Sequence, residues 1–282
     1  MQFNKTSAQT YVPDGSDLDA ALSRTTHLGI GAHQDDLEIF AYNGIAACYG
    51  RRNQWFTGVT VTNGAGSSRI GVYADYTDEE MIQVRAAEQN KAANVGGYTA
   101  QFQLDYSSSE VKDTANNSAT EDLSQILEKA GAKTVYLHNP ADKHDTHIAV
   151  LAKSLAALRG LPDELKPEKV YGCEVWRDLD WMLDNDKAVL DCSLYENMAQ
   201  SLVSLYDSQI SGGKRYDLAT AGRRLANATY FDSHSSDDAT ALTWAMDLTP
   251  LVHDASLSVK DYTLDYIDRF KEDVGEKLDR LF

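Results

Sequence analysis

The stretch of sequence that decides the fold is LGIGAHQDDLE, residues 28–38. It begins with an apolar run, Leu28 to Ile30, of the kind that forms a buried strand. A histidine and two adjacent aspartates follow this run, at positions 33, 35 and 36. Because open α/β sheets keep their binding sites beyond the carboxyl ends of the strands, the segment predicts a strand that ends in metal-type ligands.

A second polar cluster lies far along the chain. The segment NPADKHDTH, residues 139–147, follows another apolar run at residues 134–137. His144 and His147 have the same spacing as His33 and Asp36, so each pair can face one point from a tight turn. Two such clusters at strand ends predict one metal site assembled from distant parts of the chain.

Strand and helix patterns alternate through the first part of the chain. Strands are expected at residues 27–32, 55–62, 100–105, 134–138 and 169–175, and helices at 39–49, 78–95, 121–130 and 147–158. This alternation predicts an α/β fold with a Rossmann-like, mostly parallel sheet flanked by helices.

The two ends of the chain follow other patterns. Residues 1–25 are polar and are predicted to form an arm that packs onto the domain. After residue 185 strand signals become sparse, and helices are expected at 193–210 and 216–229. The last segment, 255–282, predicts a C-terminal helix that packs on the body or, alternatively, forms a subunit contact. Without internal repeats, residues 1–282 are expected to form one domain.

Composition narrows the class of protein. The chain has 43 acidic and 26 basic side chains and a formal charge of −17, which argues against nucleic acid or an anionic membrane as partner. No apolar stretch approaches the ~18 residues of a membrane span. The N-terminus lacks a signal-peptide pattern, and Cys48, Cys173 and Cys192 show no metal or redox spacing. A soluble, cytoplasmic protein with reduced cysteines is expected.

The ligand types favour a catalytic metal. Zinc binds imidazole nitrogen and carboxylate oxygen, and catalytic sites leave one position open for water. His33, Asp36 and His147 would provide such a set, although iron or cobalt fits it too. Asp35, beside the ligand Asp36, would then be free to take a proton from the attacking water.

The two clusters together resemble the LmbE/PIG-L family of zinc-dependent deacetylases, which usually carry AHPDDxE and a later HPDH-type element. Weaker likeness extends over residues 26–212, in Thr62–Gly66, Arg85–Glu88, Asp191–Ser193 and Ser208–Gln209. The resemblance implies an LmbE-like fold and removal of an N-acetyl group from an amino-sugar substrate. It also implies that His33, Asp36 and His147 bind zinc, that Asp35 is the general base, and that His144 is an acid or oxyanion stabiliser.

This sequence departs from the family pattern at both clusters. Gln34 stands where the family has proline, which should loosen the turn. Asp145-Thr146 stands where it has Pro-Asp, so the acid that supports the catalytic histidine is missing. We expect Asp142 or Asp145 to replace it and to keep His144 protonated.

Further residues are candidates for the substrate or for support of the site. Arg69 resembles a substrate-gripping arginine, and Asn63 begins the glycine-containing loop after the second strand. Glu38 would support the first loop, cap the helix or meet substrate. Trp176 could form a sugar platform or be a buried aromatic residue. His138 is expected to support the ligands. The segment 232–238 reads as a polar loop rather than a second metal cluster.

The leading function is zinc-dependent deacetylation of a small N-acetylated amino sugar or glycoconjugate. An amidase acting on a thiol conjugate or another non-sugar amide uses the same chemistry. A dinucleotide-binding oxidoreductase is disfavoured, because the first strand ends in paired acids instead of G-x-G-x-x-G. A phosphoacceptor receiver domain needs no histidine there and is shorter. A non-catalytic metal- or sugar-binding homologue would be expected to lack Asp35. The sequence leaves a homo-oligomer possible.

Overall fold

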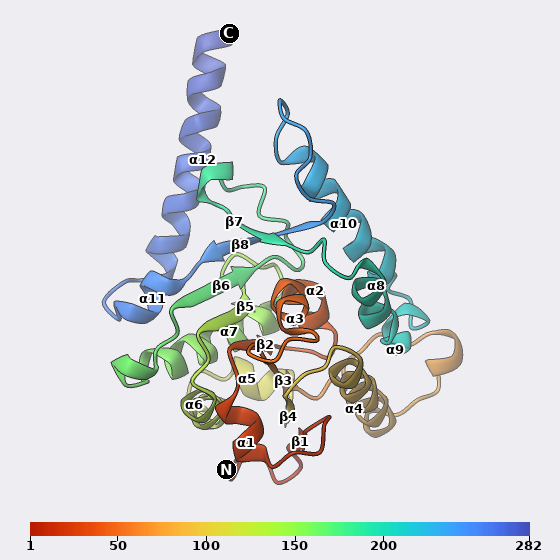
Figure 1. Ribbon diagram of the computed structural model, residues 1–282. Coiled ribbons are helices and arrows are strands. Elements are labelled where there is room, and N and C mark those ends of the chain that lie inside the picture. The colour runs from red at the N-terminus through yellow and green to blue at the C-terminus, as the bar shows by residue number, and fades with distance from the viewer.

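The computed structural model describes residues 1–282 and is built around an eight-stranded mixed sheet in the order β1-β4-β3-β2-β5-β6-β8-β7 (Figure 1). The five central strands are parallel. They are β4 (Ala100–Tyr106), β3 (Phe56–Thr62), β2 (His27–Gly31), β5 (Thr134–His138) and β6 (Lys169–Cys173). All five strands expected from the sequence are therefore present, and the predicted Rossmann-like α/β fold is confirmed.

Helices cover both faces of the sheet and give two apolar cores. One core includes side chains of α1 (Leu18–Ser23), α6 (Ser118–Ala130), α7 (Asp145–Arg159) and α11 (Thr249–His253). The other includes side chains of α2 (Asp36–Phe40), α3 (Tyr42–Cys48), α4 (Asp78–Val95) and α8 (Glu196–Ser204). The remaining helices are α5 (Ser108–Lys112), α9 (Asp207–Ile210), α10 (Tyr216–Tyr230) and α12 (Val259–Leu281).

Three antiparallel strands were not expected from the sequence. β1 (Gln9–Tyr11) pairs with β4, so the N-terminal arm is part of the sheet. β8 (Leu242–Asp247) pairs with both β6 and β7 (Ala188–Asp191) and extends the other side of the sheet. Two helices expected to be continuous are each divided: residues 39–49 fall in α2 and α3, and residues 193–210 in α8 and α9.

The C-terminal helix α12 packs on the body only at its beginning. Tyr262 and Tyr266 contact the first core, and the Tyr262 hydroxyl donates to the carbonyl of Asp247 at 2.7 Å. Beyond these turns the helix extends away from the sheet (Figure 1). The predicted helix is therefore present, but its expected packing holds only for its first turns. None of the helices is long and apolar enough to cross a membrane.

Candidate metal centre

The first cluster lies in the turn between β2 and α2, and neighbouring strands hold that turn in place. The hydroxyl of Thr62 on β3 donates to the carbonyl of Ala32 at 2.7 Å, and Ala32 N–H donates to Nε2 of His138 on β5 at 2.9 Å. Within the turn, the backbone N–H of His33 donates to Asp36 Oδ2 at 2.7 Å. The turn is thus fixed from both sides.

Gln34 does not loosen this turn, contrary to the expectation from the missing proline. Its side chain is buried, and Nε2 donates to the carbonyl of Thr62 at 3.2 Å. Its own carbonyl accepts a hydrogen bond from Arg85 of α4. Hydrogen bonds to two neighbouring elements therefore replace the backbone restriction that a proline would impose.

The second cluster begins helix α7. His147 lies in the first turn of this helix and is buried, whereas His144 is the N-cap residue and is partly exposed. Asp142 Oδ2 lies 3.2 Å from His147 Nδ1, and Asp142 Oδ1 accepts from the backbone N–H of His144 at 2.9 Å. One carboxylate thus sets the orientation of the His147 ring and the start of the helix.

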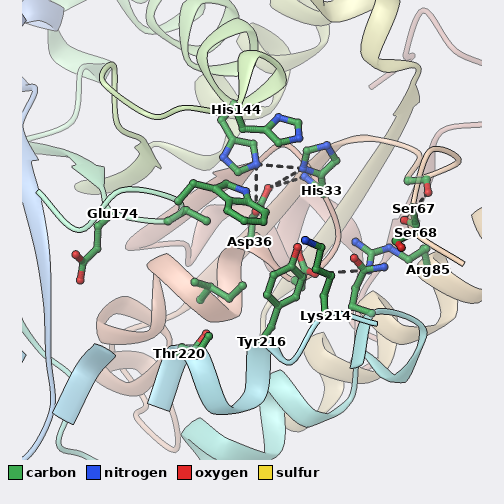
Figure 2. A pocket seen from close by; sticks show the side chains of 18 of the residues that line it. His33, Asp36, Ser67, Ser68, Arg85, His144, Glu174, Lys214, Tyr216 and Thr220 are labelled. Carbon is green, nitrogen blue, oxygen red and sulfur yellow. Dashed lines mark hydrogen bonds and ion pairs between the residues drawn. The ribbon is translucent and has the colours of Figure 1, made fainter. Parts of the chain in front are cut away.

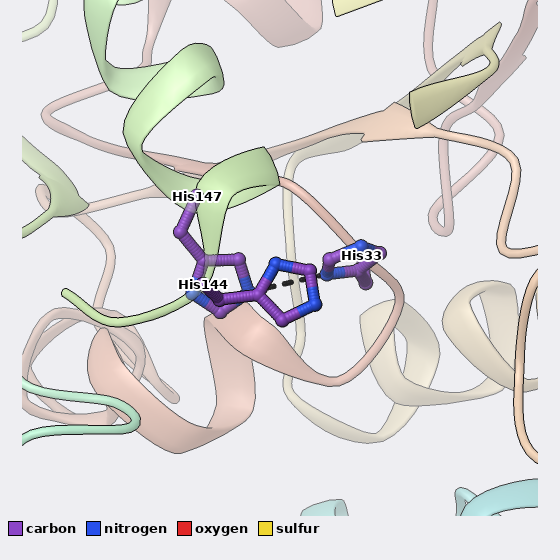
Figure 3. Close-up of side chains that lie close together, drawn as sticks. All are labelled: His33, His144 and His147. Carbon is purple, nitrogen blue, oxygen red and sulfur yellow. Dashed lines mark hydrogen bonds between the residues drawn. The ribbon is translucent and has the colours of Figure 1, made fainter. Parts of the chain in front are cut away.

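The two clusters meet at the carboxyl ends of β2 and β5. His33 Nδ1 lies 3.2 Å from His147 Nε2 and 3.4 Å from Asp36 Oδ2, and His147 Nε2 lies 3.5 Å from Asp36 Oδ1. Figure 2 shows the imidazoles gathered beside the Asp36 carboxylate, and Figure 3 shows rings from the two segments side by side. The structure therefore brings the three predicted ligands together.

These distances fit a metal ion. Zinc binds nitrogen and oxygen ligands at about 2.0–2.2 Å, which places ligand atoms of a tetrahedron roughly 3.3–3.5 Å apart. His33, His144 and His147 also form a group whose ligand atoms lie within 4.8 Å of one another, as do Asp36, His138 and His147. The bond from Asp142 to the second nitrogen of His147 is the support that metal-bound histidines commonly have.

His138 supports the cluster. It is fully buried, its ring stacks on that of His147 at a centroid distance of 3.9 Å, and its Nε2 lies 3.3 Å from Asp36 Oδ2. The same nitrogen accepts a hydrogen bond from Ala32 N–H, so its lone pair is not available to bind a metal ion. His138 is thus buried and in contact with two of the predicted ligands.

The two adjacent aspartates have opposite electrostatic environments. Burial alone would raise the pKa of Asp36, but the imidazoles of His147 and His138 hold that pKa well below its usual range. Burial raises the pKa of Asp35 to about 8, against the opposing effect of the Arg85 guanidinium. Asp35 Oδ2 is buried without a hydrogen-bond partner, and Arg85 Nη1 lies 3.5 Å from it. Asp36 thus faces the imidazoles, and Asp35 remains available for other contacts.

His144 lacks the acid that the sequence suggested for it. Asp142 contacts the ring of His147 and only the backbone of His144, and Nδ1 of His144 has no partner. No hydrogen bond joins Asp145 to the ring either. Burial and the neighbouring imidazoles lower the pKa of His144. Neither Asp142 nor Asp145 therefore hydrogen-bonds the His144 ring in this structure, and their part in its protonation stays a prediction.

A cavity of about 440 Å³ opens beside the cluster. Its lining includes His33, Asp35, Asp36, His144 and His147, together with Gly64–Ser68, Arg85, Glu174–Trp176, Lys214 and Tyr216. The ring centroid of Trp176 lies 6.4 Å from that of His144 and 6.0 Å from that of Tyr216. The predicted platform residue Trp176 thus lies at the site, and Tyr216 of α10 joins it.

Three other predicted substrate residues do not line this cavity. Arg69 forms an ion pair with Asp78 and donates to the carbonyl of Tyr76 at 2.9 Å. Asn63 accepts from the backbone N–H two residues on. Glu38 is buried away from the cavity, and its carboxylate accepts hydrogen bonds from Tyr98, Tyr206 and Gln89. These side chains hold the loop and α2 in place instead.

Five charged residues that line the cavity were not predicted as site residues: Lys214, Arg223, Arg224, Arg85 and Glu174. Arg85 was noted only as part of a family-like helix segment, and Glu174 was placed inside a strand without a role. Both are almost completely buried. Their signal in the sequence is a charge within an apolar segment, which is costly to bury unless it has a partner or a function.

The comparisons with known proteins agree with this geometry. Residues 28–158 match the family model PIG-L, described as GlcNAc-PI de-N-acetylase, and this range contains both clusters. This match supports assignment of the chain to the PIG-L (LmbE-like) family. One relative is the uncharacterized deacetylase YaiS of Escherichia coli, which is 27% identical over 157 residues, covering 55% of this chain and 79% of the relative.

Solved structures share the fold at low sequence identity. N,N'-diacetylchitobiose deacetylase from Pyrococcus horikoshii aligns with a TM-score of 0.63 and 13% identity, over 82% of this chain and 86% of that one. GalB, the 4-carboxy-2-hydroxymuconate hydratase of Pseudomonas putida, aligns with a TM-score of 0.62 and 15% identity, over 79% and 95%. Because these neighbours catalyse different reactions, the fold alone does not fix the chemistry.

Proposed function

We propose that this chain is a metal-dependent deacetylase that hydrolyses the amide of a small N-acetylated amino sugar or glycoconjugate. The observation that carries the proposal is the convergence of His33, Asp36 and His147 within 3.5 Å, beside the carboxylate of Asp35, whose buried Oδ2 has no hydrogen-bond partner. The family match supports it. In this proposal residues 1–282 act as one domain, because strands from both ends of the chain join one sheet.

His33, Asp36 and His147 would hold the ion, zinc or another divalent transition metal. When bound, such an ion polarises a carbonyl and increases the acidity of water. Asp35 lies at the cavity wall next to this position and takes the proton from the attacking water. Its pKa, raised by burial, makes its carboxylate a stronger base than that of an exposed aspartate. Arg85 balances the charge of Asp35 at 3.5 Å.

His144 would act on the other side of the amide. Its ring lies 5.1 Å from that of His33 and 4.6 Å from that of His147, centroid to centroid, and it lines the cavity. From there its N–H can donate a hydrogen bond to the oxyanion, while the proton that Asp35 takes from the water passes to the departing amine, which leaves poorly until it is protonated. Removing the imidazole should therefore slow turnover without removing the three ligands.

The cavity suits a sugar. An indole and a phenol, Trp176 and Tyr216, meet edge to face and can cover the apolar face of a pyranose ring. Ser67, Ser68 and Lys214 line the same cavity and offer hydrogen bonds to hydroxyl groups (Figure 2). A thiol conjugate or other non-sugar amide is the alternative substrate, because the predicted metal ligands do not themselves determine specificity for a sugar.

Acetate release tests this function. Metal-loaded protein is incubated with N-acetylglucosamine, N,N'-diacetylchitobiose, an N-acetylated thiol conjugate and a non-sugar acetamide. We expect release from a sugar member, and we expect Asp35→Asn to keep the metal and lose turnover. Asp145→Asn, on the exposed side of α7, is the matched control and should retain turnover. Metal binding without acetate release from any member would contradict the proposal and favour a non-catalytic homologue.

A further inference from the structure

Helix α12 carries along its length an apolar stripe that the rest of the chain leaves partly exposed. The stripe consists of Leu264, Ile267, Val274, Leu278 and Leu281, whose exposed fractions run from 36% to 73%. With Lys271 these positions repeat at intervals of three and four residues, which is the a and d pattern of a coiled coil. A helix with such a seam normally packs against another helix.

An apolar groove lies at the foot of the same helix. Its volume is about 580 Å³, and nine of its thirteen lining residues are hydrophobic. One wall is α7, where Ile148 is exposed and Leu151 and Leu155 are buried beneath it. The other wall is the beginning of α12, with Leu264 and Ile267. Because these last two residues belong to both, the groove and the stripe form one continuous apolar surface.

We propose that a second copy of this chain covers this surface, with the two α12 helices packed antiparallel. The intervals between the stripe residues are the same when counted from either end of the helix. In an antiparallel pair, Leu264 therefore faces the partner's Leu281. Ile267 likewise faces the partner's Leu278. The partner's distal leucines, which have no body of their own to contact, thereby reach the groove at the foot of α12. One occupant accounts for both apolar features.

Lys271 determines the orientation. In a parallel pair, equivalent a positions face each other, so two lysine side chains would meet within the seam. In the antiparallel pair, Lys271 faces the partner's Val274, and its apolar stem can pack there while the ammonium reaches solvent. The antiparallel pair is also closed by a two-fold axis, as in most homodimers. Since α12 points away from the sheet, the two bodies lie at opposite ends (Figure 1).

The charges of α12 make a lipid surface a poor alternative occupant. Helices that lie on membranes carry mainly lysine and arginine on their polar face. The polar face of α12 has more acidic than basic residues: Asp261, Asp265, Asp268, Glu272, Asp273, Glu276 and Asp279 against Lys260, Arg269, Lys277 and Arg280. Such a mixed surface can face water in a dimer, whereas it would be repelled by anionic lipids.

Sedimentation velocity of the full chain between 1 and ~100 µM tests the dimer. We expect the wild type to be a dimer and Leu278→Lys to weaken association at least tenfold. Glu276→Lys, which adds a lysine to the same turn on the opposite face, should leave association unchanged. Lys271→Leu should tighten it. A wild-type monomer at the highest concentration, a larger assembly, or equal association of Leu278→Lys would each overturn the proposal.

A spin label tests the orientation. The three native cysteines are buried, so a label on Asp261→Cys is selective. At 1.5 Å rise per residue, the antiparallel register separates the two labels by roughly 35 Å along the axis. A parallel pair would bring them within about 15 Å. The longer distance supports the proposal, and the shorter one refutes it. Far-UV circular dichroism of each variant shows that the helix is still formed.

Discussion

Replacing Glu174 with glutamine should change how the stability of the protein depends on pH. Glu174 follows β6 and is almost completely buried. Its Oε1 accepts from Asn227 Nδ2 at 2.7 Å and from the backbone N–H of Trp244 at 3.2 Å, whereas Oε2 has no partner. The amide of Glu174→Gln keeps the same acceptor for both bonds but cannot ionise.

The size of the effect follows from the pKa. Burial raises the pKa of Glu174 from 4.5 to about 8, although the nearby Arg223 opposes this. Between these two values the folded protein retains a proton that the unfolded chain has released, so the free energy of unfolding falls as pH rises. At ~1.36 kcal/mol per pKa unit, the loss over the whole window is at most about 5 kcal/mol. Below pH 4.5 both states are protonated, and the penalty vanishes.

Urea denaturation between pH 4.5 and 8.5 measures this loss, with wild type and variant compared at each pH. We expect Glu174→Gln to match the wild type at the acidic end and to exceed its stability by roughly 2–4 kcal/mol near pH 7. Glu196→Gln, at an exposed position in α8, is the control and should follow the wild-type curve. A constant difference between Glu174→Gln and wild type over the whole range would refute the reasoning.

Three further changes test the site and its support. Arg85→Ala should lower kcat/KM for acetate release at least about tenfold, whereas Arg69→Ala should change it less than about twofold, because only Arg85 reaches the cavity. Gly44→Ala should reduce the free energy of unfolding by about 1–3 kcal/mol in urea titration, because its Cβ would lie 2.5 Å from an aromatic ring of β5; Gly66→Ala, with open space around it, should not. Asp142→Asn should weaken metal affinity roughly 10–100-fold in a chelator competition, with little change in Tm of the metal-free protein, because it orients a ligand imidazole.

The sequence predicted the central sheet and the ligand cluster for the same physical reason. The parallel strands are buried on both faces, and β2 and β5 appear as short apolar runs, which mark their ends within a residue or two. His33 and Asp36 follow one such run, and His147 follows another. Once the runs are assigned to adjacent parallel strands, β2 and β5, their carboxyl ends must lie at the same edge.

What the sequence could not show was the direction of individual side chains. Arg69 and Arg85 both follow β3, yet the loop turns Arg69 toward Asp78 while α4 directs Arg85 to the cavity. Similarly, β8 is a run of six residues after a long helical region, and so short a run does not distinguish a strand from part of a helix. Its partners β6 and β7 decide the matter, and they are remote in the chain.

The turn after β2 explains how two neighbouring aspartates can have different roles. Asp35 has a left-handed backbone with φ of 101°, which costs a non-glycine residue about 1–3 kcal/mol. This conformation turns its side chain toward Arg85, while the next residue, Asp36, begins α2 and faces His33 and His147. The strained residue therefore separates the metal ligand from the base, and the hydrogen bonds of Gln34 hold it there.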